Sequence, residues 1–180
     1  MKKYTDILTF WFETLSPKDW WRKNETLDVQ IKRQFGEVHE KVVQGQTASW
    51  RDTDEGRLAE IIVLDQFSRN MFRGQPESFA YDAQALELCK AAVKSGTHIR
   101  LDQSMVSFLL MPYMHSESLA EHQAGLPLFE QYCSEGTVDF EHRHAAIIKR
   151  FGRYPHRNDI LDRKSSPEEL SFLTEAGSSF

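Results

Sequence analysis

Cysteine is scarce in this chain of 180 residues, and its two cysteines, Cys89 and Cys133, stand in no spacing typical of metal ligands. This count excludes a disulfide scaffold and a cysteine zinc site, and it is typical of a reduced, cytoplasmic protein. No run of about 20 apolar residues occurs, so we expect no membrane-spanning segment. Asp6 and Glu13 interrupt the apolar stretch near the start, which argues against a signal peptide.

Known catalytic and metal-binding motifs are also absent. The chain has no glycine-rich phosphate loop, no serine elbow of the GxSxG type and no HExxH pattern. The residues that could in principle surround a metal ion, without any supporting spacing, are His115, Glu117, His122 and His144. We therefore expect no metal and no cofactor. The sequence leaves open whether the protein is an enzyme, and it indicates no oligomeric state.

Positive charge is in deficit, with 22 Lys and Arg against 27 Asp and Glu, a net charge of −5. A general nucleic-acid binder needs a basic surface, so we expect no nucleic-acid partner. The charge is uneven, however, because residues 143–164 hold seven Lys and Arg against two Asp. That region is either an anion-attracting surface or a solvated helix face whose partners lie elsewhere in the fold.

Apolar residues recur at helical spacing along most of the chain, and no strand pattern competes. We predict one all-α domain over residues 1–180, a compact array of seven to nine helices packed as antiparallel pairs. Asp28 is the expected N-cap of the second helix, Pro112 is expected to break the fifth, and Gly177 is expected to close the last. The expected helices cover about residues 6–15, 28–43, 55–68, 76–95, 102–112, 118–132, 139–151 and 166–176.

Residues 64–74, which we call the first segment, interleave Phe, Arg, Asn and Gly at the end of a predicted helix. Arginine forks and amide side chains beside aromatic rings can bind an anionic or planar group. The simpler interpretation is an Asp65–Arg69 ion pair four residues apart on one helix face. The candidate binding residues of this segment are Asp65, Gln66, Arg69, Asn70 and Arg73.

Residues 150–158, the second segment, have the same composition but follow a helix and straddle Pro155. Its candidate binding residues are Arg153, His156, Arg157 and Asn158, which either bind a ligand from a loop or cap carbonyls and join neighbouring helices. His144 lies on the apolar face of the preceding helix, where a histidine is commonly a hydrogen-bonded core residue. His115 and Glu117 follow a predicted helix break and complete the candidate set.

The chain resembles the bacterial family known as domain of unknown function 924 over essentially its whole length. The stretches that carry the resemblance are residues 7–12, 20–21, 58–59, 64–74, 111–117, 144, 150–158, 160–161 and 166–169. Three positions depart from the family pattern, since Ser68, His122 and Asp162 stand where Pro, Gln and Gly are usual. The resemblance implies an all-helical, tetratricopeptide-like fold and no established activity. No 34-residue repeat is visible in the sequence itself.

Three functions remain open from the sequence. The first is a helical-array protein that binds a small anionic or planar ligand, or a peptide carboxylate, through the two segments. The second is an enzyme acting on an anionic substrate, with a histidine as general acid or base. In the third, both segments are purely structural and lock helices together. The ligand hypotheses require that Arg69, Arg73, Arg153 and Arg157 meet in the fold.

Overall fold

The computed structural model describes residues 2–180 and contains no strand within them. π-helical turns at Thr9–Thr14 and Val63–Phe67 extend α1 and join α4 to α5. When these joined segments are counted as single helices, seven helices are longer than ten residues, whereas α2, α7 and α11 are short. The predicted all-α array is therefore confirmed. The α-helices are α1 (Tyr4–Leu8), α2 (Pro17–Trp21), α3 (Glu25–Val43), α4 (Asp54–Ile62), α5 (Ser68–Met71), α6 (Asp82–Lys94), α7 (Thr97–Arg100), α8 (Gln103–His115), α9 (Leu119–Tyr132), α10 (Glu135–Phe151) and α11 (Pro167–Phe172).

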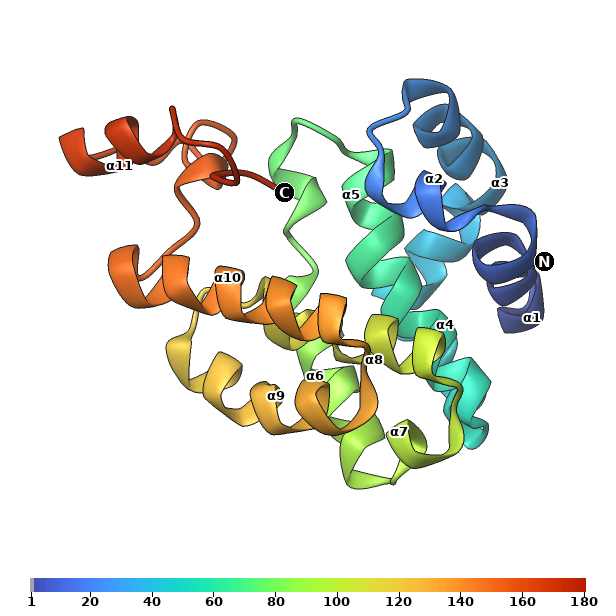
Figure 1. Ribbon diagram of the computed structural model, residues 1–180. Helices are drawn as coiled ribbons and strands as arrows, with labels where there is room; N and C mark the ends of the chain where they lie inside the picture. The colour runs from blue at the N-terminus through green and yellow to red at the C-terminus, as the bar shows by residue number, and fades with distance from the viewer. Residues whose placement is uncertain (1) are drawn as a thin grey trace.

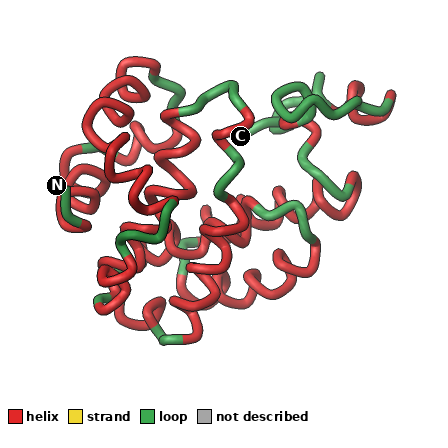
Figure 2. Tube along the Cα trace, turned by 180° about the vertical axis from the view of Figure 1, so that it is seen from behind, coloured by secondary structure: helices red, strands yellow, loops and turns green. Residues whose placement is uncertain are grey.

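The helices pack beside their neighbours in the chain, with α1 to α5 on one side of the molecule and α6 to α10 on the other (Figure 1). Helix α8 packs against α9 and α6, and α10 packs against α9. The links between α8, α9 and α10 are short, as expected for antiparallel neighbours. Figure 2 shows that loops dominate only around α11 and between α5 and α6. The array is compatible with a tetratricopeptide-like arrangement.

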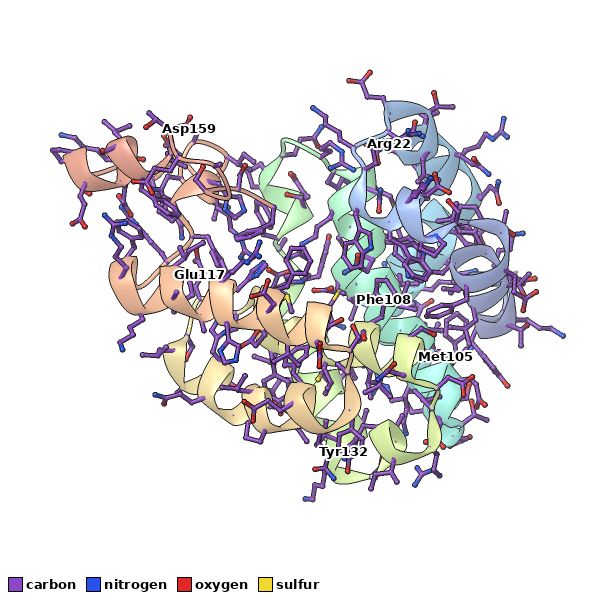
Figure 3. The ribbon with its side chains drawn as sticks, viewed as in Figure 1. Arg22, Met105, Phe108, Glu117, Tyr132 and Asp159 are labelled. Atoms are coloured by element: carbon purple, nitrogen blue, oxygen red, sulfur yellow. The ribbon has the colours of Figure 1, made fainter. Side chains whose placement is uncertain are left out.

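Aromatic rings fill the main core between the two sides. Phe67 is fully buried and contacts the rings of Phe10, Trp11 and Phe35. Figure 3 labels Phe108 among the side chains between the two sides of the molecule, where it packs edge-on to Trp11. Most of the large aromatic content is therefore used for packing. A second, smaller core formed by Ile147, Ile148, Tyr154 and Phe172 joins α10 to the loops and α11.

Three helix starts differ from the sequence prediction, and the simplest case is α10, which begins at Glu135 instead of about residue 139. Helix α3 begins at Glu25 and is capped by Asn24, whose side-chain oxygen accepts hydrogen bonds from two backbone amides. Asp28, the expected cap, instead binds residues of the first segment, because its side chain faces the end of α5. Helix α6 begins at Asp82, and Pro76 starts a separate turn of 3-10 helix.

Two helix ends also differ. Pro112 lies inside α8, which continues to His115 instead of breaking. Pro112 and its neighbours are buried in this turn, so packing offsets the lost backbone hydrogen bond. Helix α11 starts at the predicted Ser166 capping box but ends at Phe172, well before Gly177. Tighter turns follow, since Thr174 N–H bonds to the Ser171 carbonyl.

The remaining expectations concern the backbone and the membrane. Asp162, where the family usually has glycine, adopts a φ of 52°, in the left-handed region that favours glycine. Cys89 lies in the core. Within residues 2–180, no helix combines the length and apolarity that crossing a bilayer requires.

Candidate functional site

The π-helical turn between α4 and α5 buries the carboxylate of Asp65 completely. Such turns insert an extra residue into a helix and are frequent at functional sites. Asp65 accepts hydrogen bonds from His115 Nδ1 at 2.7 Å and from Gln66 Nε2 at 2.6 Å, and Arg69 Nη1 lies 3.4 Å away. Burial opposes ionisation of Asp65, but its neighbours His115 and Arg69 and these hydrogen bonds outweigh it. They lower the pKa of Asp65 below its usual value, so the carboxylate is ionised.

His115 ends α8 and uses only one ring nitrogen within the described part of the chain. An ionised carboxylate can only accept, so Nδ1 of His115 carries the hydrogen that Asp65 accepts. The Nε2 atom has no hydrogen-bond partner among residues 2–180, and 16% of the side chain is exposed. Burial and the charge of Arg69 lower the pKa of His115 below its usual value, against the opposing effect of Asp65. A neutral His115 with an unprotonated Nε2 is therefore expected at neutral pH.

Arg69 and Arg157, one from each segment, meet at the carboxylate of Asp82. Arg69 donates two hydrogen bonds to Asp82, at 2.8 and 2.9 Å, and Arg157 Nη1 lies 3.2 Å from the same carboxylate. Arg157 Nη2 also donates to the backbone carbonyl of His115 at 3.0 Å. The Arg157 guanidinium lies 4.5 Å from the Phe79 ring centre and 4.8 Å from that of Tyr154. The two segments are thus joined at one place, with their charges already paired.

Three histidines, His122, His144 and His156, surround the buried ring of Tyr154, and His115 lies beside His144. We call this group of four the histidine cluster. The ring centre of Tyr154 lies 5.7 Å from that of His144 and 5.6 Å from that of His156. Gly152 ends α10 with a positive φ of 70°, and Pro155 then starts a short 3-10 turn. This sharp exit brings Tyr154 and His156 back against α10.

Phe180 lies on this cluster. Its ring stacks on His144, with centres 3.7 Å apart and planes inclined by 25°, and it meets His156 nearly edge-on at 5.8 Å. The residue remains 52% exposed. Figures 1 and 2 both place the end of the described chain beside the segment between α5 and α6. A ring from a distant part of the sequence therefore covers the candidate site.

Burial keeps two further histidines of the cluster neutral. It lowers the pKa of His144 to about 3, and it lowers the pKa of His156 to about 4, helped by the charge of Arg157. His144 Nδ1 bonds to the backbone carbonyl of Phe140 at 2.7 Å. This contact is the hydrogen-bonded core environment that the sequence suggested for His144.

His122 and Glu141 form a buried pair that the sequence analysis did not place in the site. Nδ1 of His122 lies 2.7 Å from Glu141 Oε1, and Nε2 lies 2.9 Å from the backbone carbonyl of Ser116. Both side chains are almost fully buried. The sequence contains one sign of this pair, because a histidine and a glutamate stand on the apolar faces of adjacent predicted helices. Periodicity alone could not show that these faces meet.

The other candidate residues are bound to partners of their own. Arg73 and Asn70 both bind Asp28 on α3, at 2.6 and 2.8 Å for the closest atoms. Arg153 binds Glu169 at 2.7 Å. The expectation that four arginines meet therefore holds for Arg69 and Arg157, while Arg73 and Arg153 share no partner with them.

Glu117 and Asn158 organise the loops before α11. Glu117 accepts two hydrogen bonds from Arg163, at 2.8 and 2.9 Å, and a third from the backbone amide of Tyr154. Asn158 binds the side chains of Ser165 and Arg163. Figure 3 labels Glu117 near α10 and Asp159 in the loops above it. These contacts fold the second segment, and they use the polar atoms that a ligand would need.

In the described part of the chain, the histidine cluster coincides neither with a group of metal-ligating side chains nor with either of two surface hollows. Residues 2–180 contain no group of three or more His, Cys, Asp or Glu arranged to hold a metal ion. Two surface hollows of about 540 and 340 Å³ are lined by residues 22–26 and by a group that includes Cys133 and His142. Neither includes a candidate residue of the two segments.

The fold and the cluster define an all-helical protein in which two arginine-bearing segments close around buried histidines. The chain belongs to the family described as bacterial protein of unknown function (DUF924), whose model matches residues 7–177. A solved structure, the protein of unknown function ATU0120 from Agrobacterium tumefaciens, is 30% identical with a TM-score of 0.90. The match covers 94% of this chain and 96% of that one. No curated protein matches the sequence.

Proposed function

We propose that the protein binds a small ligand through a planar group, at a platform formed by the rings of His144, Tyr154 and His156. The observation that carries this proposal is the stacking of Phe180 on His144 at 3.7 Å. An aromatic ring that is held by one face while half exposed supports a planar group as the occupant of this position. The planar part of a ligand, or an aromatic side chain of a peptide, would take the place of Phe180.

Of the two ligand classes suggested by the sequence, planar and anionic, the contacts favour the planar one. Arg69 and Arg157 already share Asp82, and Arg73 and Arg153 are bound to Asp28 and Glu169. An anion would have to displace a carboxylate from each guanidinium. A stacked ring needs only to displace Phe180, which has little burial to lose.

Binding of three small probes to the Phe180→Ala variant tests the proposal. Benzamide and benzoate share a planar ring and differ in charge, whereas acetate has the charge without the ring. We expect both aromatic probes to raise the melting temperature of the variant, more than that of the native protein, and acetate to have no effect. Stabilisation by acetate and benzoate but not by benzamide would contradict the planar-group proposal.

Leu170→Ala is the matched control for that experiment, because Leu170 is also an exposed apolar residue, at 57%, and lies on α11 away from the rings. We expect this variant to respond to the probes as the native protein does. His144→Ala should lose the response of the Phe180→Ala background. An unchanged response after loss of His144 would place the binding elsewhere.

A second role is supported by the same contacts, namely that the arginines lock the helices together. Each of the five arginines in the two segments reaches a carboxylate from another element, and Arg157 is only 7% exposed. We also propose a cytoplasmic location, because Cys89 and Cys133 are both free in the structure.

A further inference from the structure

We propose that His115, oriented by Asp65, is a general base that activates water for attack on an aryl ester whose ring stacks on His144. The choice of substrate rests on the proposed planar-group site, whereas the basic character of His115 rests on its own contacts. The enzyme hypothesis of the sequence analysis thereby gains a specific base and a specific positioning residue.

The hydrogen bond to Asp65 determines which ring nitrogen of His115 carries the hydrogen. The ionised Asp65 fixes the hydrogen of His115 on Nδ1, at 2.7 Å, which leaves a lone pair on Nε2. Asp65 is itself held by Gln66 and Arg69, so its carboxylate cannot turn away. Arg157 holds the backbone carbonyl of His115 at 3.0 Å and fixes the last turn of α8. The imidazole is therefore fixed in one tautomer and one orientation, as a positioned base requires.

The charged groups around the ring of His115 also support its role as a base. The charged groups that act on His115 are Asp65, Arg69 and Asp82, and the neighbouring histidines are His144 and His156. Burial and Arg69 favour the neutral imidazole, and Asp65 stabilises the imidazolium that forms when Nε2 takes a proton.

His115 also lies close to the rings that form the proposed binding platform. The ring centres of His115 and His144 are 6.4 Å apart, and Phe180 lies on His144 with a spacing of 3.7 Å. We therefore place the substituent of a ring bound in the position of Phe180 on the side of His144 that faces His115. An ester group attached to the ring fits this arrangement, because the acyl carbon then lies beyond the edge of the platform.

In the proposed step, His115 Nε2 takes a proton from water while the water oxygen forms a bond to the acyl carbon. The bond between that carbon and the aryl oxygen then breaks, and the proton passes from Nε2 to the leaving phenolate. The products are a carboxylic acid and a phenol, and no oxidant or cofactor is consumed. His115 would be the catalytic residue in this reaction and Asp65 a positioning residue.

Hydrolysis of para-nitrophenyl acetate by the full chain tests the activity. General bases contribute about 10²-fold to 10⁴-fold to such rates, so we expect His115→Gln to lose at least about 10²-fold of the rate above background. His142→Gln is the control, because His142 is an exposed histidine of α10, and it should hydrolyse the ester at the native rate. Asp65→Asn should reduce the rate with the fold retained by circular dichroism. A native rate in His115→Gln would overturn the proposal.

Nitrogen spectra of the imidazole rings give a readout that needs no substrate. At neutral pH we expect His115 to carry hydrogen on Nδ1 and none on Nε2, with a titration midpoint below the ordinary value of about 6.5. Asp65→Asn should mix the two tautomers. A native His115 protonated on Nε2 would overturn the proposal. His115→Gln should still bind benzamide in the Phe180→Ala background, so failure of the binding site and failure of the base are distinguishable.

Discussion

His122 and Glu141 form a buried hydrogen-bonded pair in the interior of the protein. Nδ1 of His122 lies 2.7 Å from the Glu141 carboxylate, and Nε2 lies 2.9 Å from a backbone carbonyl, that of Ser116. Both neighbours of the ring accept hydrogen bonds when Glu141 is ionised, so the imidazole must then carry a hydrogen on each nitrogen. The alternative places that same proton on Glu141. Either form requires the two side chains to remain together.

This pair predicts a difference between two substitutions of His122. Removing one member of a buried charged pair costs about 3–5 kcal/mol, so His122→Ala should lower the free energy of unfolding by about that amount. His122→Gln can donate to either acceptor through its amide and should lose much less. Urea denaturation of both variants measures the difference. Equal losses in both variants would contradict the account of the pair.

The lock between Arg153 and Glu169 predicts a loss of stability when Arg153 is removed. Arg153 donates to both oxygens of Glu169, at 2.7 and 2.8 Å, and the Glu169 side chain is only 4% exposed. We expect Arg153→Ala to lower the free energy of unfolding by about 1–3 kcal/mol. The control is Arg143→Ala, whose pair with Asp139 is more than half exposed on both sides and should contribute under about 1 kcal/mol. Similar losses in the two variants would show that Arg153 does not act as a lock.

The buried histidines predict that the protein becomes less stable as the pH is lowered. The folded-state pKa values of His39, His144 and His156 are lowered to about 4, 3 and 4. An unfolded histidine titrates near 6.5, so the unfolded chain binds more protons as the pH falls below that value. Stability from these residues is complete above about pH 6.5 and is lost on descent toward about pH 3 to 4.

Urea denaturation at about pH 7.5 and about pH 5 measures this loss. His144→Phe keeps a ring against Phe180 and removes one titrating group, so the drop in stability between the two pH values should be smaller. A native protein equally stable at both values would rule out buried neutral histidines as the cause.

Close packing of α8 against α9 predicts opposite effects at two glycines. A methyl group on Gly125 would lie 2.7 Å from Cβ of Tyr113, whereas one on Gly36, inside α3, meets nothing within 4 Å. Gly125→Ala should therefore lower the free energy of unfolding by about 1–3 kcal/mol through overpacking. Gly36→Ala should raise it by up to about 1 kcal/mol, because alanine favours the helix. Thermal unfolding of the two variants checks both signs, and a stabilised Gly125→Ala would be inconsistent with this packing.

Local patterns predicted the helices well but not the partners of the polar residues. The spacing of Ile31, Phe35 and Val38 marks one buried face of α3 correctly. Asp28 fitted a cap by its position in the sequence, yet its side chain binds Arg73, which is 45 residues away. Whether a carboxylate caps its own helix or pairs with a distant arginine depends on how helices pack, which periodicity does not contain.

The candidate site, like the fold, could be predicted only in part from the sequence. The composition of the two segments singled out Arg69 and Arg157, and the structure brings both to Asp82. The stacking of Phe180 on His144 could not be found from sequence, because Phe180 belongs to no periodic pattern and its contact is set by the path of the loops after α10. The π-helical turn that buries Asp65 likewise has no signal in helical spacing.

The most direct test of the planar-group site is a set of intermolecular nuclear Overhauser effects between benzamide and the Phe180→Ala variant. The account predicts contacts from the probe's ring protons to the ring of His144, with His156 and Tyr154 nearby. Phe180 in the native protein should compete with the probe and weaken these contacts. Binding of benzamide without any contact to His144, or no binding in the variant at all, would contradict the account.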